Sequence, residues 1–403
     1  MPAHHTIYSR IGSSLLGLSL LGGCAGHGVS RIDLDAAWEG VALPGAETSG
    51  QSSASRDVTT PIGTIPGGQI QSTRSLLPET VRDADGWSKD IMTAFQAHRI
   101  PPTRENLCAA IAVIAQESSF QAEPVVAGLP RIIQTELEKR RDQFHVPNAV
   151  FDAALAIKSP NGKTYGERIR ALRTENDLNR LYDDMISELP LGKMLLGNKN
   201  PVKTGGPMQV SLVYAEQKMK ASPYPYPNPG PLRSEVFSRR GGLYFGIGYL
   251  LDYPAPYDQM VYRFADYNAG HFASRNAGLQ KTVADLSEQT LSLDGDLLRY
   301  EGEKPSRTPS ETLDAILSIK DQIGVSETDI RDDLAREKTP DLETTATWKG
   351  LRDLASLKGK MPPRAHLPEI RLISPKITSG LTTAGFARKV NARYTQCLGR
   401  AKN

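Results

Sequence analysis

Residues 104–118 have the sequence RENLCAAIAVIAQES, which is apolar over most of the circumference of a helix. A helix with so little polar surface packs at the centre of a domain, so this stretch predicts a central helix. Glu117 stands at its C-terminal end, on the same face as Ala110 and Val113. Partial burial and the negative end of the helix dipole are both expected to raise the pKa of this carboxyl group. The alternative is a glutamate exposed at a helix end.

The rest of the chain predicts a mainly α body that is ordered from about Leu76. Thr308-Pro309-Ser310-Glu311 resembles a capping box with Pro at the first helical position, and Ser326-Glu327-Thr328-Asp329 resembles a second one. A strand-like alternation of useful length occurs only at 369–373. Further helices are predicted at 78–98, 210–220, 241–251, 259–267 and 382–397, with three more within 131–190.

The N-terminus has the pattern of an export signal. Residues 1–23 contain a short apolar run that suits a signal-peptide core, and Leu21-Gly22-Gly23-Cys24 resembles the bacterial lipobox. Cys24 is therefore the predicted lipidation site, and a plain secretory signal with an incidental Cys is the alternative. By resemblance to the enterobacterial sorting rule, Ala25 after the Cys indicates the outer membrane, with the protein facing the periplasm. Residues 24–75 are predicted to form the lipidated N-terminus and a flexible stalk, because 40–75 is rich in Gly, Ser, Thr, Pro and Gln.

Composition limits the possible partners. A net charge of +3 without a long basic block gives no reason to expect nucleic acid. The seven His residues show no metal-ligand spacing, so we expect neither a metal site nor a cofactor. No stretch after the N-terminus is long and apolar enough for a transmembrane helix. Cys108 and Cys397 either form one disulfide or remain two free thiols, and their spacing does not decide between these states.

Two later segments give Glu117 a chemical context. They are Gly206-Pro207-Met208-Gln209 and Asp266-Tyr267-Asn268-Ala269-Gly270. In this order after Glu117-Ser118, they resemble the motifs of lytic transglycosylases of the lysozyme-like superfamily, which are related to goose-type lysozymes. The resemblance covers about 105–279 and implies a lysozyme-like catalytic domain within 76–290.

The resemblance implies a reaction on peptidoglycan glycan strands. Glu117 would protonate the bond between N-acetylmuramic acid and N-acetylglucosamine, then take the proton of the muramic acid C6 hydroxyl, which leaves a 1,6-anhydro end. Tyr267 would offer its hydroxyl to Glu117 or to the substrate acetamide, although it could also be a buried structural Tyr. Met208 is either an adaptable wall of the site or simply part of the core. The implied substrate-binding residues are Ser118, Asn200, Met208, Gln209, Tyr267 and Asn268.

The chain departs from the family pattern in three places. Glu117 and Gln209 are 92 positions apart (209 − 117), where the family usually has a short loop. Residues 129–198 would then be a helical insertion, and Asn200 would replace a site hydroxyl with an amide. Asp266 could be a second carboxylate for hydrolysis, but a solvated surface Asp is the favoured interpretation.

Three functions remain open at this stage. Lytic transglycosylase activity is the leading prediction, a lysozyme-type hydrolase is the second, and a non-catalytic glycan-binding scaffold is the third. Residues 291–403 are predicted to be a helical C-terminal extension. This extension or the insertion could bind a protein partner of the cell envelope.

Overall fold

The computed structural model describes residues 65–143, 145–188, 200, 202–301, 304–371 and 381–400. It is mainly helical, as the sequence predicts. Within the described ranges the strands form two small antiparallel hairpins, of two residues per strand. They pair β1 (Thr204–Gly205) with β2 (Val210–Ser211), and β3 (Tyr300–Glu301) with β4 (Lys304–Pro305).

The body of the molecule is a helical assembly around α4 (Arg104–Glu117). Residues 108–114 of this helix are each at most 1% exposed, which confirms the predicted central helix. The last helix, α19 (Thr383–Arg400), packs along α4 and α13. A disulfide between Cys108 and Cys397 joins α4 to α19. The other helices of the body are α2 (Gly67–Leu76), α3 (Ala84–Ala97), α10 (Leu212–Ala221), α11 (Leu232–Phe237), α12 (Arg239–Leu251) and α13 (Met260–Ala269).

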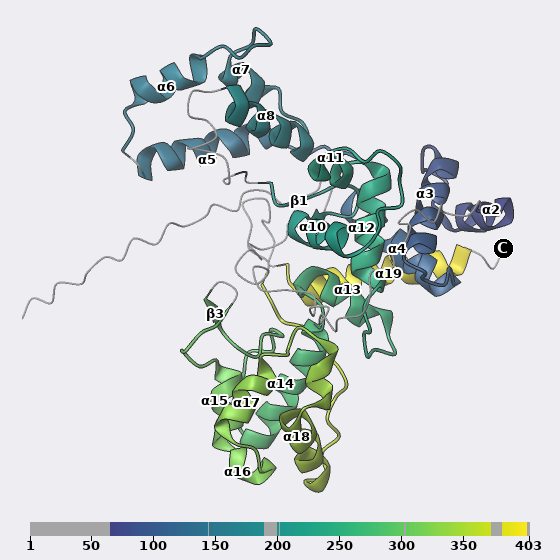
Figure 1. Cartoon of the computed structure of the whole chain (residues 1–403), viewed down its shortest axis with the longest axis vertical. Coiled ribbons are helices and arrows are strands. Elements are labelled where there is room, and N and C mark those ends of the chain that lie inside the picture. The colour runs from purple at the N-terminus through teal and green to yellow at the C-terminus, as the bar shows by residue number, and fades with distance from the viewer. Residues whose placement is uncertain are drawn as a thin grey trace, which may run out of the picture.

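The described part of the predicted insertion, residues 129–143 and 145–188, which we call the insertion, stands apart from the body at one end of the molecule (Figure 1). Its helices are α5 (Leu129–Gln143), α6 (Asn148–Ala156), α7 (Tyr165–Arg170) and α8 (Glu175–Glu188). Three of them are the predicted ones, whereas α7 was not predicted and begins at a capping box formed by Thr164 and Glu167. The insertion has its own apolar core, which extends onto Phe237 of α11. This contact connects the insertion to the body.

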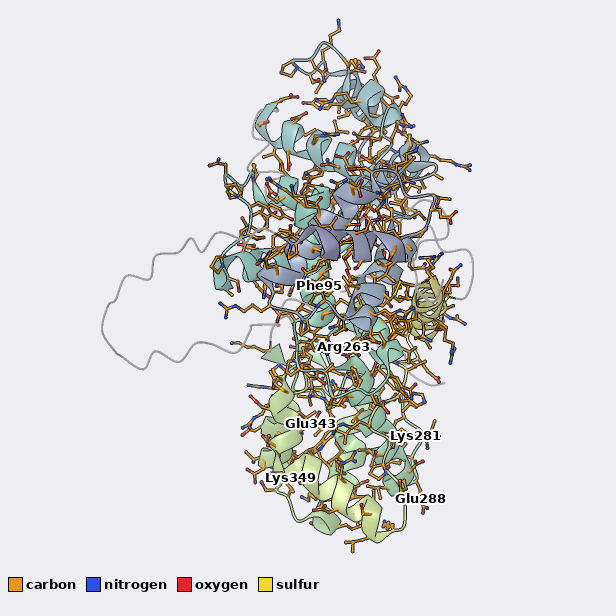
Figure 2. All side chains as sticks on the ribbon, turned by 90° about the vertical axis from the view of Figure 1, so that its right-hand side faces the viewer. Phe95, Arg263, Lys281, Glu288, Glu343 and Lys349 are labelled. Carbon is orange, nitrogen blue, oxygen red and sulfur yellow. A yellow bond between two sulfur atoms is a disulfide. The ribbon has the colours of Figure 1, made fainter. Side chains whose placement is uncertain are left out.

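A third group of helices, which we call the distal unit (residues 273–357), lies at the opposite end (Figure 1). Figure 2 shows its labelled side chains Lys281, Glu288, Glu343 and Lys349 well below Phe95 of the body. Leu279 and Val283 of α14 contribute to the distal core. The unit contains α14 (Ala273–Ser287), α15 (Glu311–Ser318), α16 (Lys320–Ile323), α17 (Glu327–Leu334), the short helix η1 (Pro340–Thr344) and α18 (Ala346–Leu357).

The predicted division of the chain at residue 291 is wrong in two respects. The distal unit already begins with α14, because this helix buries one face in the distal core. The C-terminal helix α19 belongs to the body, where Phe386, Val390 and Cys397 lie in the central core. Residues 291–403 are therefore not an extension, since the chain leaves the body and then returns to it.

The structure also corrects several predicted boundaries. Helix α2 occupies residues that were assigned to the stalk. Helix α15 is capped by Ser310, whose hydroxyl accepts from the amide of Leu313, and not by Thr308. The cap at Ser326 is as predicted. Within 369–373, Arg371 makes an isolated bridge to Thr382, and residues 372–380 lie outside the described part.

The predicted signal peptide and the lipidation site Cys24 lie outside the described residues. In the part of the chain that the structure describes, every helix is too short or too polar to cross a membrane.

Candidate functional site

Glu117 is the last residue of α4 and is 1% exposed. Ser118 ends the helix, with both its amide and its hydroxyl donating to the carbonyl of Ile114 at 3.0 Å. The next two residues, Ser119 and Phe120, have φ angles of 49° and 60°, a conformation that non-glycine residues seldom adopt. Strained backbone of this kind persists only where the surrounding structure imposes it, and it is frequent at functional sites. The chain therefore makes a forced turn directly after Glu117.

The second predicted segment forms the tight connection between β1 and β2. Gly206 has φ of 74°, and a Cβ atom there would lie 2.0 Å from the carbonyl oxygen of Val236, so only glycine fits. Gln209 also has a positive φ of 52°. Its side-chain nitrogen Nε2 donates to the carbonyl of Gly206 at 3.3 Å, and its side-chain oxygen Oε1 accepts from Thr204 Oγ1 at 3.3 Å. Gln209 is thus held rigidly, with 3% of its surface exposed.

Met208 lies in the core and not at the surface. Its side chain is completely buried against Gly246 of α12, where a Cβ atom would lie 2.5 Å from the Met208 sulfur. Of the two interpretations of Met208, the structure supports the core residue. Its backbone carbonyl accepts a 2.7 Å hydrogen bond from Tyr267 Oη, which links the second predicted segment to the third.

The third segment occupies the C-terminal end of α13. Asn268 is 3% exposed, and its side-chain oxygen accepts a 2.9 Å hydrogen bond from Thr383 of α19. Its amide nitrogen is buried without a hydrogen-bond partner among the described residues. Gly270 ends the helix as its C-cap, with φ of 112°, a conformation that favours glycine.

Helix α19 supplies contacts that sequence reasoning missed. Besides the bond from Thr383 to Asn268, Arg393 Nε donates to Gln116 Oε1 at 3.0 Å, next to Glu117. One helix thus contacts both the residue before the first segment and the third segment itself. The sequence signal that could have indicated these contacts of α19 is Cys397, because its disulfide to Cys108 joins α19 to the central helix α4.

Asp266 is not a solvated surface residue, so that interpretation is wrong. Its side chain is fully buried. It accepts hydrogen bonds from Tyr253 Oη at 3.0 Å, Tyr257 Oη at 2.6 Å and the amides of Phe272 and Ser274 at 2.9 and 2.7 Å. Burial raises the pKa of Asp266 to about 6, although these hydrogen bonds oppose the rise. Asp266 joins α13 to the start of α14.

Asn200 binds the insertion. Its amide nitrogen donates to Asn179 Oδ1 at 2.9 Å and to Asp183 Oδ1 at 3.3 Å, and both acceptors lie on α8. Its side-chain oxygen accepts from the amide of Val202 at 3.0 Å. Asn200 therefore connects the loop before β1 to the insertion, which replaces its predicted role as a substitute for a site hydroxyl.

Comparison with known proteins places the chain in a family. Residues 80–400 match a family described as a protein of unknown function, DUF1615. The chain belongs to the DUF1615 family. A relative from Escherichia coli (strain K12), described as uncharacterized protein YaiW, is 46% identical over 326 residues, which cover 81% of this chain and 88% of the relative. No solved structure matches the chain. The DUF1615 match includes the body, the insertion and the distal unit.

Proposed function

We propose that this DUF1615 protein is a peptidoglycan lytic transglycosylase with a lysozyme-like body. The observation that carries the proposal is the position of Glu117. It ends the central helix with 1% of its surface exposed, and a forced turn follows. Helix α19 and the bond from Tyr267 to Met208 connect the other two segments to the same core. These contacts support the proposal that the three segments act in one site.

In the proposed reaction, the Glu117 carboxylic acid donates its proton to the glycosidic oxygen as the bond from that oxygen to C1 of muramic acid breaks. The resulting carboxylate removes the proton of the C6 hydroxyl, and O6 bonds to C1. The ring closes without consuming water, and Glu117 regains its proton. The amide nitrogen of Asn268, which has no hydrogen-bond partner among the described residues, and the fixed side-chain amide of Gln209 are the groups proposed to bind sugar oxygens.

Asp266 gives a reason to prefer this reaction to hydrolysis by two carboxylates. A hydrolase of that kind needs a second carboxyl group that reaches a water molecule beside the scissile bond. Asp266 was the candidate, but it is fully buried and held by four donors. Glu117 is thus the acid on which the proposed chemistry depends.

The location also belongs to the proposal. The segment Leu21-Gly22-Gly23-Cys24 supports a lipid anchor on Cys24 in the outer membrane, with the body in the periplasm. Peptidoglycan would then be the glycan nearest to the anchored protein.

The test is the release of soluble fragments from purified peptidoglycan by the wild type, by Glu117→Gln and by Glu105→Gln. Glu105 lies on the same helix but is exposed in its first turn, so its variant is the matched control. We expect the Glu117 variant to lose at least about 100-fold in rate, the lower range for removal of a general acid, and the control to keep its activity. Equal release by all three proteins would overturn the proposal.

A further inference from the structure

A pocket of about 610 Å³ lies where the insertion meets the body. Three segments line it, namely the loop that follows Glu117, helix α8 of the insertion, and helix α11 with the residues beside it. The residues that matter for its chemistry are Glu123, Asn176, Asn179, Arg180, Asp183, Arg233 and Phe237.

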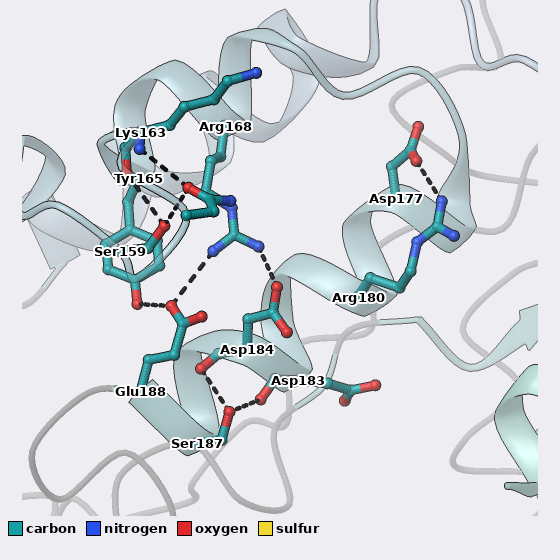
Figure 3. A network of polar contacts seen from close by, with 11 residues as sticks. Ser159, Lys163, Tyr165, Arg168, Asp177, Arg180, Asp183, Asp184, Ser187 and Glu188 are labelled. Carbon is teal, nitrogen blue, oxygen red and sulfur yellow. Dashed lines mark hydrogen bonds and ion pairs between the residues drawn. The ribbon is translucent and has the colours of Figure 1, made fainter.

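The two arginines of the pocket differ in their partners. Arg180 donates to Asp177 at 2.8 Å, with Glu123 at 4.0 Å, so carboxylates already balance its charge. Figure 3 shows the pair of Arg180 and Asp177, both of which lie on α8. Arg233 instead donates to two neutral oxygens, Asn179 Oδ1 at 2.7 Å and the carbonyl of Val202 at 3.0 Å.

Arg233 is a half-buried cation that makes no direct ion pair in the described part of the chain, although the charge of Asp183 acts on it from a greater distance. No carboxylate oxygen in the described part of the chain lies within 4.0 Å of its guanidinium group. The nearby carboxylate of Asp183 receives hydrogen bonds from Asn179 and Asn200 instead. Burial lowers the pKa of Arg233, because the charge has lost part of its water, and the nearby charge of Asp183 opposes this shift. A guanidinium group in this state favours a ligand with a carboxylate, because its planar donors match the two oxygens.

The rest of the pocket suits a short peptide. Pro231, Leu232 and Phe237 give it an apolar side, and the amide of Asn176 lies among its polar groups. The pocket also lies near the proposed acid, because Glu123 is six residues after Glu117 (123 − 117) and six residues span at most about 20 Å.

We propose that this pocket binds a free carboxylate of the peptide stem on muramic acid, with Arg233 as its ionic partner. This rests on the proposed function, since the stem is attached to the sugar whose C1 bond is cleaved. The insertion then contributes to substrate specificity, because α8 forms one wall of the pocket and its Asn179 fixes the Arg233 guanidinium group.

The experiment compares glycan strands that carry stems with the same strands after an amidase has removed them. We expect the wild type to cleave stem-bearing strands with about 10-fold higher kcat/KM. In Arg233→Gln, KM for these strands should rise about 10-fold with kcat nearly unchanged, since one charge-assisted contact is lost. Cleavage of bare strands should stay as in the wild type. Arg331→Gln, the matched control, should keep the preference, because that arginine lies on α17 outside the pocket and is paired with Glu327.

Several outcomes would overturn the proposal. If Arg233→Gln weakens cleavage of both strands equally, Arg233 only fastens α11 to α8. If the wild type cleaves strands with and without stems at the same kcat/KM, the pocket does not bind the stems. Arg233→Lys keeps the charge and should restore part of the preference, which covers the case in which the Gln variant does not fold.

A binding measurement separates this inference from the proposed function. Calorimetry with a soluble stem tetrapeptide and the full chain requires no cleavage. Binding to the wild type that is lost in Arg233→Gln supports the pocket even if neither strand is cleaved. No binding to the wild type contradicts it, even if the strands are cleaved.

Discussion

The ends of α4 and α13, two helices that pack along α19, each bury a carboxyl group. Around Asp266, two tyrosine hydroxyls and two backbone amides converge on the carboxylate and fix α13 to α14. Around Glu117, Ser119 and Phe120 are held at positive φ soon after it, and Phe272, whose amide donates to Asp266, is held at positive φ as well. Burial alone therefore does not identify a catalytic acid. Asp266 has the surroundings of a structural group, because its four donors join α13 to the start of α14, whereas Glu117 ends the central helix α4.

The strongest test of this difference is to remove each carboxyl group. Asp266→Ala leaves four donors in the core without their acceptor, so we expect it to lower the free energy of unfolding by about 3–5 kcal/mol. Glu117→Gln keeps the shape of the side chain, and we expect a change of about 1 kcal/mol or less. Urea denaturation measures both. Equal losses in the two variants would remove the distinction.

The contrast also shows what sequence can predict. The apolar run at 108–114 is enough to predict that α4 lies at the centre, because a helix without a polar face is unstable at the surface. Helical spacing did not show which core each face joins, so Leu279 and Val283 of α14 were assigned to the wrong unit. The role of Asp266 depends on donors from two loops and the start of α14, and no pattern near position 266 reveals them.

The parts of the site that depend on contacts between distant residues could not be predicted from the sequence either. Cys108 and Cys397 are 289 positions apart, and only the packing of α19 on α4 decides that they pair. The contact of Arg393 with Gln116 follows from this packing. Asn200 was placed by analogy with a family motif, whereas its partners on α8 belong to the insertion, which the family pattern lacks.

The disulfide should stabilise the Glu117 region directly, because it joins α4 to α19. We expect Cys108→Ser with Cys397→Ser to lower the free energy of unfolding by about 2–5 kcal/mol, since the open chain gains conformational freedom when it unfolds. Chemical denaturation with and without reductant measures this loss. Reduced wild type should match the double variant, and a wild type insensitive to reductant would contradict the assignment.

The pH dependence of stability sharpens the account of Asp266. Its pKa is raised from 3.8 to about 6, so its contribution is fully present below about pH 3.8 and is lost as the pH rises through about 6. A shift of about two units corresponds to about 3 kcal/mol. The stability of the wild type minus that of Asp266→Asn should therefore fall by about this amount from pH 4 to pH 7. A difference that stays constant or rises with pH would contradict the assigned shift.

The smallest expected effect concerns the bond between the second and third segments. Tyr267→Phe leaves the buried carbonyl of Met208 without its donor, which should cost about 1–2 kcal/mol in thermal or urea unfolding. Tyr262→Phe on the same helix is the control, because its hydroxyl donates no hydrogen bond in the described part of the chain. If both variants unfold alike, this bond does not hold the segments together.

The central claim is that Glu117 cleaves glycan strands without adding water, and digestion of purified peptidoglycan in heavy-oxygen water tests it most directly. Mass spectrometry of the fragments then shows the new chain ends. The account predicts 1,6-anhydro ends without the heavy isotope from the wild type, and no such ends from Glu117→Gln. Reducing ends that carry the isotope, or the same fragments from both proteins, would contradict it.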